Sequence, residues 1–137
     1  MGIYWADVQF YPFGAMRITK EVTLMDIATD EVHHFIFRPP FPLDLLDHKD
    51  FRSANFIHSV LGVLHWSVGI QSLAELTAAV PMKSVLLCNG SEKVVLFKQL
   101  MPHVHSVFMW KFLMEICRVK IYVPFPFIIN YVPMPIV

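Results

Sequence analysis

The sequence is short of charge and of cysteine, and both shortages exclude classes of protein. Only 16% of the 137 residues are charged, 11 basic and 11 acidic, so the net charge of zero provides no overall attraction for nucleic acid or an anionic membrane. Such binding requires a local patch. Two cysteines cannot form a disulfide scaffold, and the N-terminus has no signal-peptide pattern. We therefore expect an intracellular protein, cytoplasmic or nuclear, with free thiols.

Hydrophobic residues are plentiful, at 55% of the chain, which is ample for the core of one domain and excludes disorder. The stretch 121–137 has no charged residue, but its four prolines exclude a membrane-spanning helix, because each removes an amide donor. We predict a domain over residues 1–117, a proline-rich apolar tail over 118–137, and no membrane contact. The tail either lies across the surface of the domain or pairs with a partner.

The first third of the chain has the pattern of a β-meander. Residues 7–13 are rich in aromatic and β-branched types and run into a turn at Gly14, and residues 18–27 follow as a second strand. A third strand is predicted over 32–38, closed by two prolines. In it His33 and His34 point to opposite faces, so we expect one to be buried and the other exposed.

The remainder alternates between helix and strand patterns. Apolar residues recur at intervals of three and four across the stretch 47–64, and Ser72 and Glu75 have the spacing of a capping box before a short helix. The further elements expected are a buried strand at 85–88, a helix at 92–101, a strand at 105–110 and a short helix within 111–116. This order predicts an α/β fold with a mixed five-stranded sheet, in which a three-strand antiparallel meander precedes parallel strands and helices flank the sheet.

Several short motifs carry a resemblance to a known family. They are Asp7-Val8-Gln9, Lys20-Glu21-Val22, the stretch 34–42, the stretch 66–73, and Cys88-Asn89-Gly90-Ser91-Glu92-Lys93. In this order they resemble the DEDD exonuclease-like branch of the ribonuclease H-like superfamily, especially uncharacterised insect proteins associated with mobile elements, and distantly Maelstrom. The resemblance implies a ribonuclease H-like sheet with the first and fourth strands adjacent and parallel.

The resemblance also implies where catalytic acids should stand. Active members use a DxE pair on the first strand and two later aspartates to hold two metal ions. Asp7 matches the first acid, but the second position is Gln9, a weaker ligand for a hard cation. The third position is Lys93, with Glu92 one residue out of register, and a cation there would repel a metal. The fourth acid has no candidate except Glu115.

One matching acid of four predicts a fold retained without its chemistry. We expect no catalysis and no cofactor, and a catalytically inactive domain that binds a protein or, weakly, RNA or DNA, in a mobile-element or genome-defence setting. The alternative is a metal-dependent 3′–5′ exonuclease or ribonuclease with an irregular site of Asp7, Glu21 and Glu92, in which Asp7 helps to hold magnesium or manganese. A further alternative is a truncated remnant of a mobile element.

Candidate nucleic-acid contacts are few. Arg17, Lys20 and Arg38 form a local basic group on the second and third strands, and the turn at Asn89 with Lys93 precedes a helix N-terminus that attracts anions. The turn is interpreted first as a helix cap, and the three tryptophans as core. Zinc accepts the ligand types of a further set of residues, but their spacing is not that of a compact zinc motif: Cys88, His103, His105 and Cys117.

Overall fold

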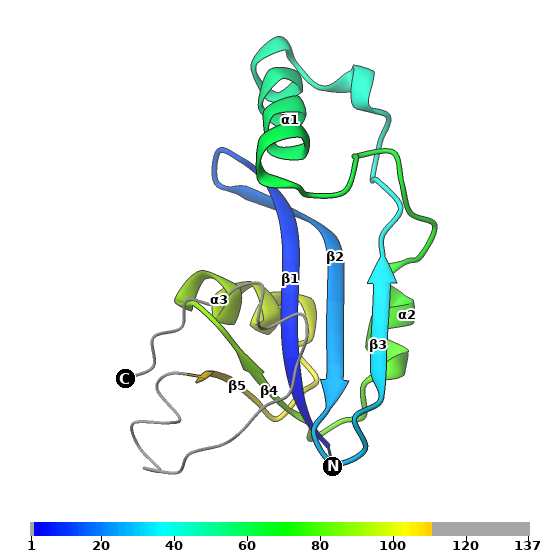
Figure 1. The fold of residues 1–137 in the computed structure, drawn as a ribbon, viewed down its shortest axis with the longest axis vertical. Coiled ribbons are helices and arrows are strands. Elements are labelled where there is room, and N and C mark those ends of the chain that lie inside the picture. The colour runs from blue at the N-terminus through cyan, green and yellow to red at the C-terminus, as the bar shows by residue number, and fades with distance from the viewer. Residues whose placement is uncertain (1, 111–137) are drawn as a thin grey trace.

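The computed structural model describes residues 2–110 and shows an α/β fold built on one mixed five-stranded sheet (Figure 1). The strands stand in the order β3-β2-β1-β4-β5. The elements along the chain are β1 (Ile3–Phe13), β2 (Met16–Asp26), β3 (Val32–Ile36), the 3-10 turn η1 (Leu43–Leu45), α1 (His48–Leu61), α2 (Leu73–Ala79), β4 (Val85–Cys88), α3 (Ser91–Leu100) and β5 (Ser106–Met109).

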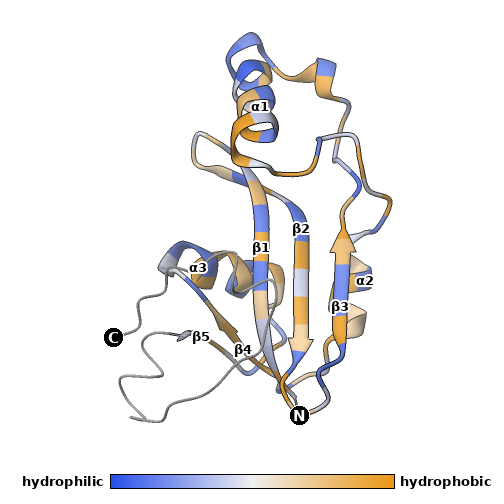
Figure 2. Cartoon of the chain, viewed as in Figure 1, coloured by the Kyte–Doolittle hydropathy of each residue, from blue (hydrophilic) through white to orange (hydrophobic). Residues whose placement is uncertain are grey.

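The three-strand meander predicted from the sequence is confirmed. β1 pairs with β2 and β2 with β3, both antiparallel, and hydrophobic and hydrophilic residues alternate along these strands (Figure 2). β1 begins at Ile3 rather than at Asp7 because its first residues also pair with β4, Ile3 opposite Val85. β3 ends at Ile36 rather than at Arg38, and Phe37 makes only an isolated bridge to Gln71.

The later strands add to the sheet in parallel, as expected. β4 lies beside β1 and parallel to it, and β5 is parallel to β4. The first and fourth strands are therefore neighbours, an arrangement compatible with the ribonuclease H-like sheet that the sequence suggested.

One face of the sheet is covered by α2 and α3. The main core cluster combines side chains that alternate along the strands with the inner faces of the two helices, and its largest fully buried members include Leu24, Leu76, Leu86 and Phe97. Ser72 caps the N-terminus of α2, and its hydroxyl accepts a hydrogen bond from the amide of Glu75, which confirms the predicted cap at that side chain.

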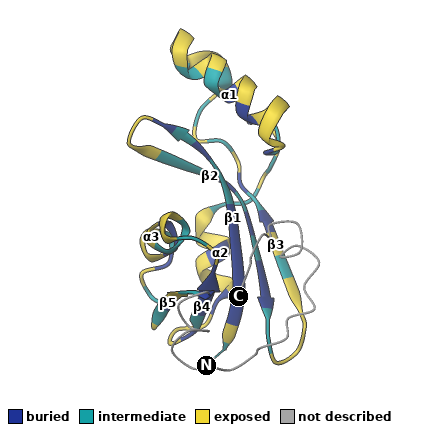
Figure 3. Ribbon diagram, turned by 60° about the vertical axis from the view of Figure 1, so that its left-hand side comes forward, coloured by how far each residue is buried: buried dark blue, intermediate teal, exposed yellow. Residues whose placement is uncertain are grey.

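The other face is covered at the far end of the β1–β2 hairpin, where a second cluster joins Tyr11 and Phe13 to Trp66 and to Ala54 and Ile57 of α1. Only these two residues of α1 are buried, and most of its surface is exposed (Figure 3). α1 ends at Leu61, earlier than predicted, because Gly62 adopts a left-handed conformation with φ of 77°.

A β-bulge decides which side chains reach which face. Gln9 lies opposite Glu21 but Phe10 lies opposite Thr19, so Lys20 is an extra residue in β2. As a result, the side chains of residues 16–19 in β2 point to the face opposite to the one that an uninterrupted strand would give them. Arg17 and Thr19 thus share the α2 and α3 face with Phe10.

The predicted helix within 111–116, Glu115, Cys117 and the tail 118–137 lie outside the described residues. Within residues 2–110, no helix has the length and apolar character required to cross a membrane.

Candidate functional site at Asp7 and Lys93

Asp7 lies where β4 stops following β1. The pairing of these strands extends only to Trp5, opposite Leu87, so Asp7 comes just after the paired segment. Its carboxylate is 11% exposed and accepts a hydrogen bond from Lys93 Nζ, with 2.5 Å between Nζ and Oδ1. Lys93 stands in the first turn of α3, directly after β4. The fold thus joins two residues that are 86 positions apart in the sequence.

Glu21 lies on the same face as Asp7 but is engaged elsewhere. It stands opposite Gln9 on the neighbouring strand, and its carboxylate pairs with His34 of β3. Because β2 lies between β1 and β3, this pairing directs Glu21 away from Asp7. His34 is 45% exposed and His33 is 33% exposed, so the expectation that one of them is buried was wrong. Both lie on β3, which forms one edge of the sheet.

Glu92, the third acid of the predicted irregular site, contacts a side chain on the opposite face of the sheet from Asp7. It is 58% exposed and lies 3.5 Å from Nε of Arg17. The Arg17 guanidinium is stacked 5.7 Å from the ring centroid of Phe10, which belongs to the α2 and α3 face. Adjacent residues of α3 therefore pair on different sides of β1, Glu92 with Arg17 and Lys93 with Asp7.

The residues present do not fit the two-metal site that the resemblance implies. Each of the three acids Asp7, Glu21 and Glu92 pairs with a different basic side chain. An ammonium about 4 Å from a divalent ion would repel it by about 8 kcal/mol at an effective dielectric constant of 20. Within the described part of the chain, no group of three or more His, Cys, Asp or Glu side chains is placed to hold a metal ion.

The five candidate nucleic-acid contacts do not form one patch. Lys93 is paired with Asp7, and Arg17 donates from Nη1 to the carbonyls of Gly14 and Met16 in addition to its contact with Glu92. Asn89 is exposed in the turn between β4 and α3. Arg38 is also exposed, and its Nη2 donates to the carbonyl of Ile70 at 3.0 Å.

Lys20 was predicted to belong to an accessible basic group on the second and third strands. The structure instead buries it, with only 2% of the residue exposed. Its ammonium donates to three backbone carbonyls: Phe37 at 3.1 Å, Trp66 at 2.6 Å, and Val68. Burial lowers its pKa to about 8. Lys20 therefore holds the end of β3 and the loop before α2 against β2, and its charge does not reach a phosphate in solution. No sequence signal marked the bulge that turns it inward.

Cys88 is buried at the end of β4, and burial raises the pKa of its thiol to about 12, a larger effect than the lowering by nearby Lys93. A protonated, buried thiol suits the core role that the sequence favoured. His103 contacts the carbonyl of Val80 at 3.0 Å and His105 is exposed, while Cys117 lies outside the described residues.

The comparisons with known proteins leave the family open. Neither the protein-family models nor the curated proteins that were searched contain a match for this chain.

Proposed function

We propose that this chain is a catalytically inactive domain of the ribonuclease H-like type, diverged from the DEDD exonuclease-like branch, that acts by binding a protein. The observation that carries this proposal is the contact of Lys93 Nζ with Asp7, 2.5 Å apart. In the resembling nucleases the space beside this aspartate holds a metal ion, and here a side-chain cation neutralises the same carboxylate.

The chemistry of phosphodiester hydrolysis supports the absence of catalysis. Two-metal hydrolysis requires cations that stabilise both the attacking and the leaving oxygen. A lysine neutralises a carboxylate but contributes one charge instead of two, and no open coordination position. Gln9, at the second acid position, adds a neutral amide. Asp7 therefore has a structural role in this proposal, as the partner of α3.

A protein partner is supported over a nucleic acid by the distribution of charge and of apolar surface. Of the basic side chains that the sequence suggested for nucleic-acid contact, Lys20 is buried and Arg17 and Lys93 are paired with acids, so these side chains do not form a continuous positive surface that could follow a phosphate backbone. In contrast, α1 exposes Phe56 and Val60 by 57% and 62%. Large exposed apolar side chains on one helix are typical of surfaces that bind proteins. An intracellular, mobile-element or genome-defence setting remains part of the proposal.

Nuclease activity on labelled single-stranded RNA and DNA tests this function, with magnesium or manganese present and Asp7→Asn as the control. We expect no cleavage above the level of that variant. Cleavage that disappears in Asp7→Asn would overturn the proposal and favour the irregular active site of Asp7, Glu21 and Glu92.

Fluorescence anisotropy of the same oligonucleotides tests the kind of partner. We expect no saturable binding at physiological salt. Saturable binding whose affinity falls steeply with salt would show that nucleic acid is the partner.

A further inference from the structure

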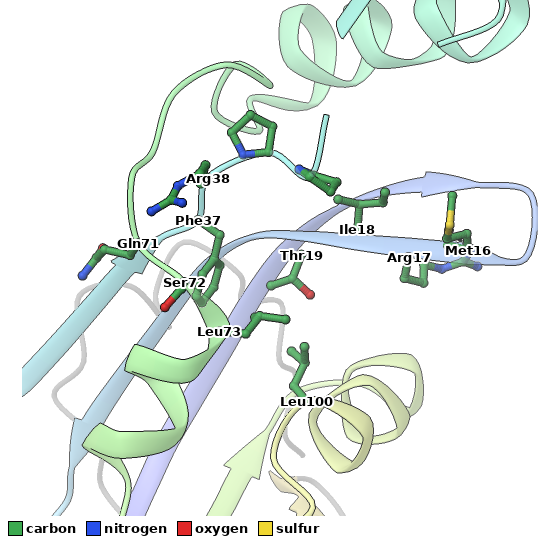
Figure 4. A pocket seen from close by; sticks show the side chains of 12 residues that line it. Met16, Arg17, Ile18, Thr19, Phe37, Arg38, Gln71, Ser72, Leu73 and Leu100 are labelled. Atoms are coloured by element: carbon green, nitrogen blue, oxygen red, sulfur yellow. Dashed lines mark hydrogen bonds between the residues drawn. The ribbon is translucent and has the colours of Figure 1, made fainter. Parts of the chain in front are cut away.

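A pocket lies on the α2 and α3 face of the sheet, on the other side of β1 from Asp7. Its volume is about 470 Å³, and its walls come from the start of β2, the chain after β3, the start of α2 and the end of α3 (Figure 4). Small-molecule sites occupy roughly 300–1,000 Å³. A cavity of roughly 150 Å³ already holds benzene, so this pocket has room for a molecule of two fused rings.

The walls of this pocket are mostly apolar. Phe37, Leu73 and Leu100 are directed into the space between the strands and the two helices (Figure 4), and the chain after β3 adds Pro39 and Pro40. Leu73 is 47% exposed although it is a large aliphatic side chain in the first turn of α2. An apolar ligand in the pocket would remove this surface from water, which favours binding.

Neither sign of charge is directed into the cavity. Among the described residues that line it none is acidic, and its two basic residues are engaged elsewhere. Arg17 is paired with Glu92 and donates to two backbone carbonyls. The Arg38 guanidinium points away from the cavity, and its Nη2 donates to the carbonyl of Ile70 (Figure 4). A charged ligand would therefore lose hydration in this cavity without an opposite charge to replace it.

One polar group of the wall is available to a ligand. The bulge at Lys20 places Thr19 on the α2 and α3 face, where it projects into the same space as Leu73 and Leu100 (Figure 4). The Thr19 hydroxyl makes no hydrogen bond to another residue within 2–110, whereas the Ser72 hydroxyl caps α2. A hydroxyl can both donate and accept, so Thr19 suits a ligand that carries a hydroxyl or a carbonyl oxygen.

We infer that this pocket binds an uncharged small molecule, with an apolar body of about the size of two fused rings against Phe37, Leu73 and Leu100 and one oxygen on the Thr19 hydroxyl. An apolar wall with few polar groups is the usual composition of a site for such a ligand, and the polar group fixes its orientation. This binding activity goes beyond the proposed function and does not depend on it.

Titration followed by NMR of the methyl groups of Thr19, Leu73 and Leu100 tests the inference with three probes of similar size. Naphthol carries the apolar body and a hydroxyl, naphthalene carries the body alone, and naphthoate is an anion at neutral pH. We expect saturable shifts with naphthol. Naphthalene should bind about fivefold more weakly because it lacks the hydrogen bond. Naphthoate should bind at least about tenfold more weakly than naphthol because its charge is not compensated.

Two variants locate the site. Thr19→Val keeps the shape of the side chain without its hydroxyl, so it should weaken the binding of naphthol about fivefold and leave that of naphthalene unchanged. Leu73→Trp should abolish the binding of both, because it fills the pocket from a position that is 47% exposed and can accept a larger side chain. Thr23→Val is the matched control: Thr23 stands on the same strand opposite Asp7, on the other face, and this variant should bind as the wild type does.

Four results would overturn the inference. The first is the absence of saturable shifts with naphthol at millimolar concentrations, which would leave a side chain of a protein partner as the occupant. The second is naphthoate that binds as tightly as naphthol. The others are an affinity for naphthol that is unchanged in Thr19→Val or in Leu73→Trp. The nuclease and metal measurements of the proposed function concern the Asp7 face, so failure here leaves that proposal unaffected.

Discussion

Removal of Lys93 should destabilise the fold more than removal of its partner Asp7. Lys93→Met keeps most of the side-chain length but leaves the Asp7 carboxylate, fixed on β1 and 11% exposed, without its ammonium. Asp7→Asn leaves an ammonium on a flexible four-carbon stem that is 21% exposed and can turn toward water. The cost of each change therefore depends on how easily the remaining charge reaches solvent.

The magnitude follows from the burial of the pair. Breaking a fully buried ion pair costs roughly 3–5 kcal/mol, and exposed pairs contribute roughly 0.2–1 kcal/mol. Side chains that are 11% and 21% exposed lie nearer the buried limit. We expect Lys93→Met to lower the free energy of unfolding by about 2–3 kcal/mol and Asp7→Asn to lower it by about 1 kcal/mol. The double variant should be more stable than Lys93→Met alone, because it leaves no uncompensated charge.

Urea denaturation at neutral pH, followed by circular dichroism, measures these differences. Glu92→Gln is the control, since it breaks a pair in which the acid is 58% exposed and should cost less than about 1 kcal/mol. The reasoning is refuted if Lys93→Met is as stable as the wild type, or if Asp7→Asn is the more damaging of the two single changes.

Two further predictions concern the contact of β3 with the loop before α2. Because the folded-state pKa of Lys20, about 8, is below its ordinary value of 10.5, the unfolded chain binds more protons between these values. The stability of the wild type relative to Lys20→Met should therefore rise by about 3 kcal/mol as the pH increases from 8 to 10.5; a constant difference in urea titrations across this range would contradict it. Gly69→Ala should destabilise by about 3 kcal/mol or more, because its Cβ would lie 2.4 Å from the Phe37 carbonyl at a φ of 114°; an unchanged melting temperature would show that the loop is not held so closely.

The sheet could be predicted because its signals are local. The alternation of apolar and polar residues indicated the meander, and a continuous apolar run indicated β4. The spacing of Ser72 and Glu75 indicated the start of α2. The parallel addition of the later strands followed from the order of elements, whereas the place of the fourth strand beside the first was implied only by the family resemblance. The extension of β1 to Ile3 was missed because it depends on pairing with β4, which is distant in the sequence.

The candidate site could be predicted only in part, because side-chain partners depend on register. Asp7 and Lys93 were both identified from motif positions, and the structure shows that they contact each other. The inward turn of Lys20 depends on one extra residue in β2, for which the sequence has no marker. The pairing of Glu21 with His34 likewise depends on the register of β2 against β3.

The central claim is that a lysine stands where a metal ion would bind Asp7. It is tested most directly by thermal melting in a manganese titration, because an ion that binds only the folded state raises its stability by mass action. The wild type should show no manganese-dependent rise in melting temperature, whereas the double variant Gln9→Glu with Lys93→Asp, which places two further carboxylates beside Asp7, should show one. A rise in the wild type that is lost in Asp7→Asn would contradict the account.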